Sequence, residues 1–240
     1  MNGPNVYLSK SEIVYRAVKE KIEAGQLLPG DRFSAKEIAD ELGVSRTPVS
    51  DAMKKMAEYG LIDILPHVGY EVKALSWKEI RDIMRIEGYL EREAISWSAQ
   101  PPDPEVLADL RRISGQIQES LQVRDRQQYN ALTNLFHKRF MDLSGSRILK
   151  DIFLKSRHYA GWDDAKMIAM TDELLAINRE HDRILTAIEQ GRIEQARQLM
   201  DEHSEHCERL IYQGLKEQGY PGLPGEDPAF ADPLTREGSI

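Results

Sequence analysis

The sequence predicts a mainly α-helical protein in two parts, three short helices with a β-hairpin followed by an all-α bundle of six helices. Apolar residues recur with a period near 3.6 along most of the chain. A strand-like alternation occurs only around PHVG, residues 66–69. We expect domains over residues 1–75 and 76–219. Residues 220–240 carry four of the eleven prolines and predict an extended or disordered tail.

The N-terminal part starts with an amphipathic helix that Ser9 or Ser11 can cap. Ser34 and Glu37 form the S-x-x-E pattern of a capping box, which predicts the start of a second, short helix. Residues 61–75 alternate β-branched and apolar side chains on both sides of a turn, so we expect a two-stranded wing there.

The second and third helices are predicted to form a helix-turn-helix. Ala39 is small where the helices cross, and Gly43 permits the bend between them. Ser45 is expected to cap the third helix, which turns Arg46, Thr47 and Ser50 away from its apolar side. A helix start with these side chains suits a DNA phosphate and the neighbouring base edges. The alternative is a small helical subdomain with a capped helix.

Composition narrows the function classes. The net charge of −8 excludes a protein that coats nucleic acid through bulk charge, although residues 1–75 are nearly neutral with 10 basic and 11 acidic residues. No apolar run approaches the length of a membrane span, and the N-terminus lacks a signal-peptide pattern. Cys207 is the single cysteine and cannot form an internal disulfide. We therefore expect a cytoplasmic protein with no membrane contact.

The stretch LLPGDRFSAKEIADELGVSRTPVSDAMKKMAEYGLIDILPHVGYEV resembles the winged helix-turn-helix of the GntR superfamily of bacterial transcription regulators. The helical remainder resembles the FCD-type ligand-binding domain of the FadR subfamily, and its length is nearer the six-helix VanR-like branch. The resemblance implies a ligand-responsive regulator, expected to be a repressor. It also implies a homodimer that binds an inverted-repeat DNA operator and a small-molecule effector.

The resemblance assigns operator contacts to two basic residues, two hydroxyls and the wing tip, namely Lys36, Arg46, Ser45, Thr47, His67, Val68 and Gly69. The third basic position of the family is Ser50 here, so one cationic contact is missing. Lys54 and Lys55, one turn further along, either compensate by reaching the DNA backbone or are simply solvated lysines.

Three histidines lie among apolar neighbours at helical spacing, each on a different predicted helix, namely His137, His181 and His203. Imidazoles that converge from separate helices form metal sites in bundle cores. The alternative is that each is a buried, hydrogen-bonded core histidine.

The resemblance favours metal, because TNLFH, REH and MDEH stand where the subfamily has its metal ligands. The family's aspartate, however, is Thr133 here; the neighbouring Asn134 could offer an oxygen but points elsewhere round the helix. Three imidazoles suit Zn²⁺, Ni²⁺ or Mn²⁺ with open positions for water or an effector carboxylate. His206 is either a substitute ligand or a surface residue.

Candidate effector contacts are Arg85, Tyr89 and Arg139, together with Thr133 and Asn134. The arginine that the family usually places near Leu90 is Glu87 here, which weakens the expectation of a simple anionic effector. Two alternatives remain open at this point. One is the same regulator with a metal-free pocket for an acyl or other apolar effector, and the other is a metal-dependent hydrolase.

Overall fold

The computed structural model describes residues 8–23, 26–99, 101–159, 171–217, 219–220 and 223. They divide into two compact units, of which the first reaches Ala74 and the second begins at Leu75. The described residues 155–159 are grouped with the first unit. The helix break predicted at residues 160–164 lies outside the described residues. So does most of the tail predicted over 220–240.

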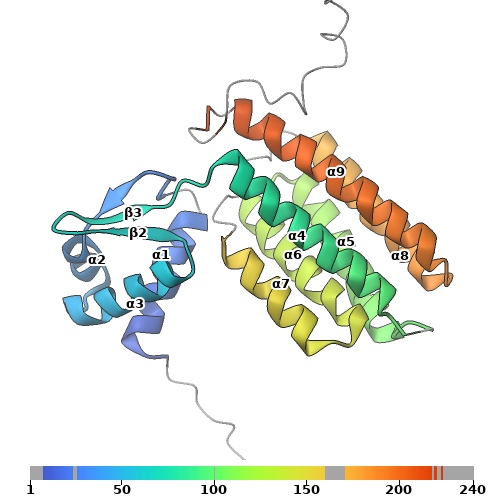
Figure 1. Cartoon of the computed structure of the whole chain (residues 1–240), viewed down its shortest axis with the longest axis horizontal. Helices are drawn as coiled ribbons and strands as arrows, with labels where there is room; N and C mark the ends of the chain where they lie inside the picture. Colours follow the sequence, from blue (N-terminus) through green and yellow to red (C-terminus); the bar gives the residue numbers. More distant parts are fainter. Residues whose placement is uncertain are drawn as a thin grey trace, which may run out of the picture. The chain divides into compact units, whose positions relative to one another are not determined.

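The first unit combines three helices with a small antiparallel sheet (Figure 1). Its elements are α1 (Lys10–Glu23), β1 (Arg32–Phe33), α2 (Ala35–Leu42), α3 (Arg46–Glu58), β2 (Ile62–Leu65) and β3 (Gly69–Val72). The strand order is β1-β3-β2, and both α1 and α2 pack against α3. The prediction of a two-stranded wing was therefore incomplete, because β1 pairs with β3 and sets Phe33 opposite Tyr70.

Local hydrogen bonds explain where these helices begin and end. Ser34 Oγ accepts from the Glu37 N–H at 3.2 Å, and Glu37 Oε2 accepts from the Ser34 N–H at 2.7 Å, which confirms the capping box. Ser9 rather than Ser11 caps α1, because Ser9 Oγ accepts the Glu12 N–H at 3.1 Å. Gly43 ends α2 with a left-handed φ of 63°, a conformation that glycine adopts at little cost.

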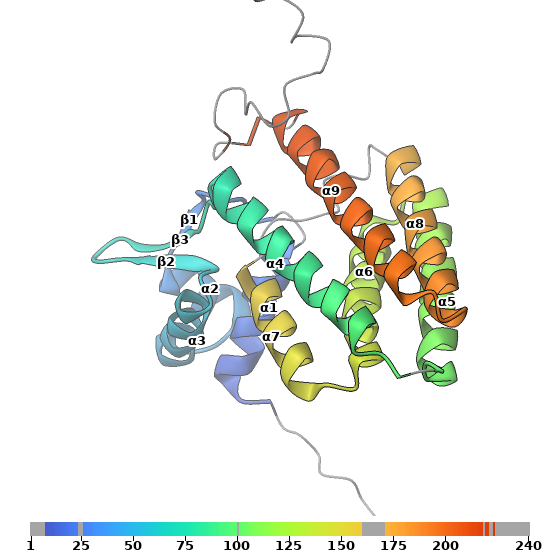
Figure 2. The same cartoon turned by 45° about the vertical axis from the view of Figure 1, so that its right-hand side comes forward.

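The second unit is a helical bundle with six α-helices in its described part, as the periodicity predicted (Figure 2). They are α4 (Trp77–Ser96), α5 (Pro104–Gln122), α6 (Arg126–Phe140), α7 (Arg147–Tyr159), α8 (Thr171–Glu189) and α9 (Ile193–Glu217). A short 3₁₀ turn, η1 (Met141–Ser144), follows α6 and was not predicted. The helix α5 packs against α6 and α8, and α9 packs against α8 and α4.

Each unit has its own apolar core. In the first unit α3 contributes Val49, Ala52, Met53 and Met56, all almost fully buried. In the second unit Phe136, Phe140 and Phe153 are among the largest buried side chains. The helices α4 and α9 approach closely at Gly88, where an added Cβ would lie 2.5 Å from Ser204 Oγ. This bundle brings α6, α8 and α9 around one set of side chains.

Gly69→Ala is expected to destabilise the wing. Gly69 has a φ of 138°, and a Cβ there would lie 2.6 Å from the backbone oxygen of Phe33. Backbone strain and the clash with β1 should together lower the free energy of unfolding by about 3 kcal/mol or more. Thermal unfolding followed by circular dichroism measures this change.

Gly43→Ala is the matched control, because Gly43 also has a positive φ but an added Cβ would meet nothing within 4 Å. It should lose only the left-handed backbone penalty of about 1–2 kcal/mol. Equal losses in the two variants would show that the approach of β1 to Gly69 does not constrain the sheet.

Candidate functional site

The start of α3 presents a polar surface next to the α2–α3 turn. Ser45 occupies the N-cap position, but its side chain makes no capping hydrogen bond, so the expected side-chain cap is not formed. Arg46 and Thr47 are exposed on the first turn, while Val49 is completely buried beneath them. The free backbone N–H groups of this helix start are therefore accompanied by three exposed polar side chains, a combination suited to phosphate.

The lysines near Ser50 differ in what they contact. Ser50 itself is half-buried, and Lys54 is exposed with Asp51 at 3.9 Å as a loose ion pair. Lys55 Nζ instead donates to Glu12 Oε2 at 3.2 Å and lies 4.9 Å from the centroid of the Tyr15 ring. Lys55 thus ties α3 to α1. Of the two lysines that could replace the missing basic contact, Lys54 is the more exposed, with 66% of its side chain accessible against 43% for Lys55.

The remaining DNA-contact candidates are exposed at the edges of this surface. Lys36 on α2 forms an i,i+4 ion pair with Asp40 at 2.9 Å, and its side chain remains 67% exposed. At the wing tip His67 is exposed and has a φ of 62°, which is unusual for a residue with a side chain. Val68 is 59% exposed, and Gly69 begins β3. The hairpin between β2 and β3 therefore projects a short, conformationally fixed tip.

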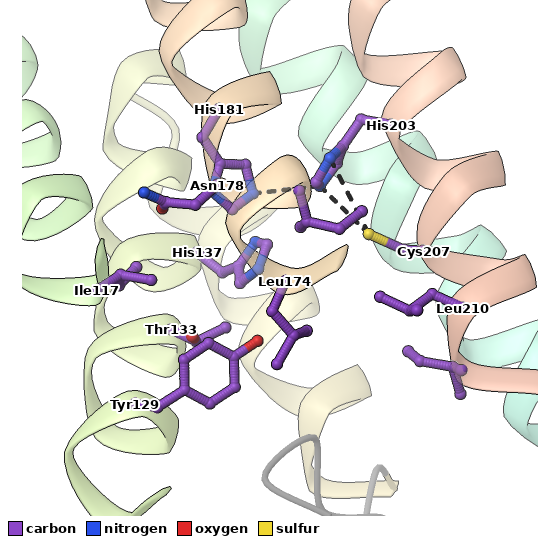
Figure 3. A pocket seen from close by; sticks show the side chains of 12 residues that line it. Ile117, Tyr129, Thr133, His137, Leu174, Asn178, His181, His203, Cys207 and Leu210 are labelled. Carbon is purple, nitrogen blue, oxygen red and sulfur yellow. Dashed lines mark hydrogen bonds between the residues drawn. The ribbon is translucent and has the colours of Figure 1, made fainter. Parts of the chain in front are cut away.

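A small cavity of about 60 Å³ lies inside the second unit (Figure 3). Apolar side chains line most of it, including Ile117, Leu174 and Leu210. Its polar lining consists of Tyr129, Thr133, His137, Asn178, His181, His203 and Cys207. All three histidines predicted from periodicity thus line one cavity, on α6, α8 and α9.

The histidines are in direct contact with one another. His181 Nε2 and His203 Nε2 are 3.2 Å apart, and the ring centroids of His137 and His181 are 5.5 Å apart (Figure 3). Burial, with the nearby His203 and His137, lowers the pKa of His181 well below its ordinary value. Burial also opposes charge on His203, but Cys207, Glu180 and Glu91 outweigh it and raise its pKa to about 10. His203 Nε2–H therefore donates to the neutral His181.

Two carboxylates orient these rings, and sequence reasoning had not included them in the site. Glu91, on α4 and only 5% exposed, lies 2.5 Å from His137 Nδ1. Glu180 on α8 accepts from His203 Nδ1 at 3.0 Å and from His206 Nδ1 at 2.7 Å. Burial favours a higher pKa for Glu180, but these hydrogen bonds lower it. His206 is thus a partner of Glu180 and does not line the cavity.

A sequence signal existed for Glu91 but not for the partner of Glu180. Glu91 lies on the apolar face of its helix, four residues before the buried Ile95, and a glutamate at such a position needs a partner. Glu180 directly precedes His181 within REH, and on a helix adjacent residues point to different neighbours.

Thr133 takes the position where the subfamily has its aspartate. It is 7% exposed and lines the cavity, and its Oγ1 is buried without a hydrogen-bond partner. His181 Nδ1 is also buried and unpartnered. Asn134, by contrast, is exposed and does not line the cavity. The cavity therefore contains two unsatisfied polar atoms, which an apolar pocket does not need.

The other effector candidates also lie outside the cavity lining. Arg85 makes two 3.1 Å hydrogen bonds to the buried Glu208 on α9. Arg139 pairs with Asp109 and with Asp142, and Tyr89 is 66% exposed. None of these three residues lines this cavity, since the arginines bind acidic partners and the tyrosine is largely exposed, and their role as effector contacts stays a prediction.

The donor set fits a divalent metal only in part. Two Nε2 atoms face each other at 3.2 Å, and the Nδ1 atoms of His137 and His203 are held by carboxylates, the outer-shell arrangement usual for metal-binding histidines. However, within the described ranges no group of three or more His, Cys, Asp or Glu side chains is arranged to hold a metal ion. The histidines form a hydrogen-bonded cluster here.

Family models match both units. A model described as "Bacterial regulatory proteins, gntR family" matches residues 10–72, and one described as "FCD domain" matches residues 82–206. The chain belongs to the GntR family. The helix-turn-helix and the wing described above are therefore the DNA-binding part of a transcriptional regulator, and the helical unit is its FCD domain.

Relatives of similar length agree with this assignment. The transcriptional regulator YdhC of Bacillus subtilis is 27% identical over 207 residues, which cover 82% of this chain and 88% of YdhC. McbR of Escherichia coli is 26% identical over 147 residues, covering 61% of this chain and 66% of McbR. The family and these relatives are transcriptional regulators, so this protein is a regulator and not an enzyme.

Solved structures share the fold. The structure of Escherichia coli McbR/YncC has a TM-score of 0.72 at 22% identity and covers 86% of this chain and 99% of its own. A GntR regulator from Rhodococcus sp. RHA1 also has a TM-score of 0.72, at 20% identity, and covers 87% of this chain and 99% of its own.

Among the helices that the structure describes, none is long and apolar enough to span a membrane.

Lys54→Ala and Lys55→Ala are expected to affect operator binding differently. Loss of the exposed Lys54 should remove one phosphate contact and make the dependence of log K on log salt shallower by about 1. Lys55→Ala should leave that slope unchanged and instead lower the thermal unfolding midpoint, because Lys55 joins α3 to Glu12. Fluorescence anisotropy at several salt concentrations measures the slopes. Equal slope changes would show that Lys55 leaves Glu12 to bind DNA.

Proposed function

We propose that this regulator is a homodimeric, ligand-responsive repressor that binds an inverted-repeat operator and responds to a small carboxylate. The observation that carries the proposal is the cavity in the FCD domain, where three histidines from three helices line a small space with two unsatisfied polar atoms. Because the proposed regulator acts on operator DNA, we also expect it in the cytoplasm.

The DNA-binding part supports a dimer. The outward surface of α3 offers few base-contacting side chains, chiefly Arg46 and Thr47, so one copy reads only a few base pairs. Two copies related by a two-fold axis double the sequence that is read and explain an inverted repeat. The family has a third basic contact at the position of Ser50. Because serine stands there, each copy has one contact fewer, and binding by two copies becomes more important here.

For the cavity we propose a divalent metal, Zn²⁺, Ni²⁺ or Mn²⁺, held by Nε2 of His137, His181 and His203. Glu91 and Glu180 occupy the Nδ1 atoms of two of these rings and so leave Nε2 for the ion. When bound, the ion supplies positive charge and open positions for an effector carboxylate. The proton between His181 and His203 must leave first, since both Nε2 atoms are needed as ligands.

A metal-free pocket for an acyl or other apolar effector is the second candidate. The mostly apolar lining favours it, as does the replacement of the family's aspartate by Thr133. In either case the effector changes DNA binding only if it binds one arrangement of the dimer more tightly than the other. Elemental analysis of the purified protein separates the two candidates.

Arg46→Ala is expected to weaken operator binding by about 1–3 kcal/mol if Arg46 makes a bidentate base contact. Arg16→Ala on α1 removes the same charge from a residue that is 57% exposed and serves as the control. Anisotropy gives the affinities, and light scattering of the complex gives its mass. Two chains per operator support the proposal. A single chain bound tightly, or equal losses in both variants, would contradict it.

Thr133→Asp tests the metal. A carboxylate one helical turn before His137 restores the charged ligand that the subfamily has. The affinity of the protein for the divalent metal ion should therefore rise by about tenfold or more. Thermal stability should rise with it, because an ion bound only by the folded state stabilises that state. The measurements are metal content and melting with and without EDTA.

Thr133→Ser is the control, because it keeps the hydroxyl and adds no charge. The metal proposal would be contradicted if the wild type contains no metal and melts identically in EDTA, and if Thr133→Asp raises neither metal content nor melting temperature. The cavity would then be a metal-free effector pocket.

A further inference from the structure

Cys207 lies in the histidine cavity, one helical turn after His203 on α9. Its Sγ is 3.6 Å from His203 Nε2, the atom that also faces His181 (Figure 3). It is the only cysteine of the chain. Neither the family resemblance nor the periodicity of the histidines gave it a role.

The distances around His203 Nε2 match those between ligands of one zinc ion. Zinc–nitrogen and zinc–sulfur bond lengths in a tetrahedron place two nitrogens about 3.3 Å apart, and a nitrogen and a sulfur about 3.6 Å apart. Here Nε2 to Nε2 is 3.2 Å, and Nε2 to Sγ is 3.6 Å. These two distances match two edges of a zinc tetrahedron that share His203.

The cavity lining also lacks the carboxylate ligand that the subfamily has. Thr133 replaces the carboxylate that the subfamily has, and its Oγ1 is buried without a partner, as is His181 Nδ1. Buried polar atoms without partners, on two residues that line the cavity, indicate that something polar binds there. Of the ionisable donors in the described lining, the Cys207 thiol has a much lower ordinary pKa than the Tyr129 phenol, so it supplies an anionic ligand more readily.

We propose that Cys207 is a metal ligand that takes the place of the missing carboxylate, together with Nε2 of His181, His203 and His137, for a thiophilic ion such as Zn²⁺. This rests on the metal proposed above. Among the described residues, His203 is close to both His181 and Cys207, but no three of the four donors surround one point. Metal binding must therefore draw the four side chains together. Two protons leave to solvent, one from the thiol and one from between the two imidazoles.

The thiolate changes which ion the site prefers. Sulfur ligands select Zn²⁺ and Co²⁺, whereas oxygen-rich sites suit Mn²⁺. A site of three imidazoles and a carboxylate would discriminate less between these ions. Cys207 therefore narrows the choice to zinc, with cobalt as a spectroscopic substitute.

Cobalt binding tests the proposal, because a Co²⁺–thiolate bond gives a near-ultraviolet charge-transfer band that nitrogen and oxygen ligands do not give. The full-length protein is titrated with Co²⁺ and then with Zn²⁺ in competition. We expect the wild type to show the band, and Cys207→Ser to lose it and to bind Zn²⁺ more than about tenfold more weakly. Mn²⁺ affinity should change little.

Two further variants complete the experiment. Met200→Leu removes a buried sulfur three residues before His203 on α9, outside the cavity lining, and should keep the band. The double variant Cys207→Ser/Thr133→Asp should regain Zn²⁺ affinity without regaining the band, because a carboxylate then supplies the charge.

Co²⁺ binding with no charge-transfer band, unchanged in Cys207→Ser, would overturn the role of Cys207 and leave the three-histidine site intact. No Co²⁺ or Zn²⁺ binding by the wild type would overturn both the ligand role and the metal itself. Operator binding is measured separately, so that a failure of metal binding is distinguished from a failure of DNA binding.

Discussion

Carboxylates buried in a helix bundle need partners, and this constraint fixes how the helices of the FCD domain meet. Glu91 joins α4 to a histidine of α6, and Glu208 on α9 receives two hydrogen bonds from an arginine of α4. Glu180 joins α8 to two histidines of α9. A sliding of one helix by a single turn would leave a buried charge unpaired, which is strongly destabilising. The position of the cavity therefore follows from the pairing of these acids.

The DNA-binding part depends on backbone conformation in a similar way. Gly43 ends α2 in the left-handed region and so directs α3, while Gly69 allows β1 to lie against β3. The capping box at Ser34 fixes the start of α2 within this frame. Because the outward face of α3 carries few basic residues, the affinity for DNA relies on the placement of those few and not on bulk charge.

Most of the fold was predictable because it follows from short-range signals. The helix periodicity, the S-x-x-E box and the glycine between α2 and α3 act within a few residues, and the structure agrees with them. The strand β1 was missed because two residues carry no alternation and pair only with β3, far along the chain. The convergence of three histidines was predictable from their apolar neighbours. The partners Glu91 and Glu180 were missed, because which helix faces which is set by tertiary packing.

The hydrogen bonds of Glu180 link the cavity to the surface. One of its oxygens binds His203, which is 3% exposed, and the other binds His206, whose side chain is 31% exposed. A continuous relay of imidazole, carboxylate and imidazole thus runs from the cavity to the surface. The most deeply buried histidine of α9 is therefore joined to a partly exposed one through a single carboxylate. A change in the charge or position of His206 at the surface acts on the cavity through two hydrogen bonds and no movement of the backbone.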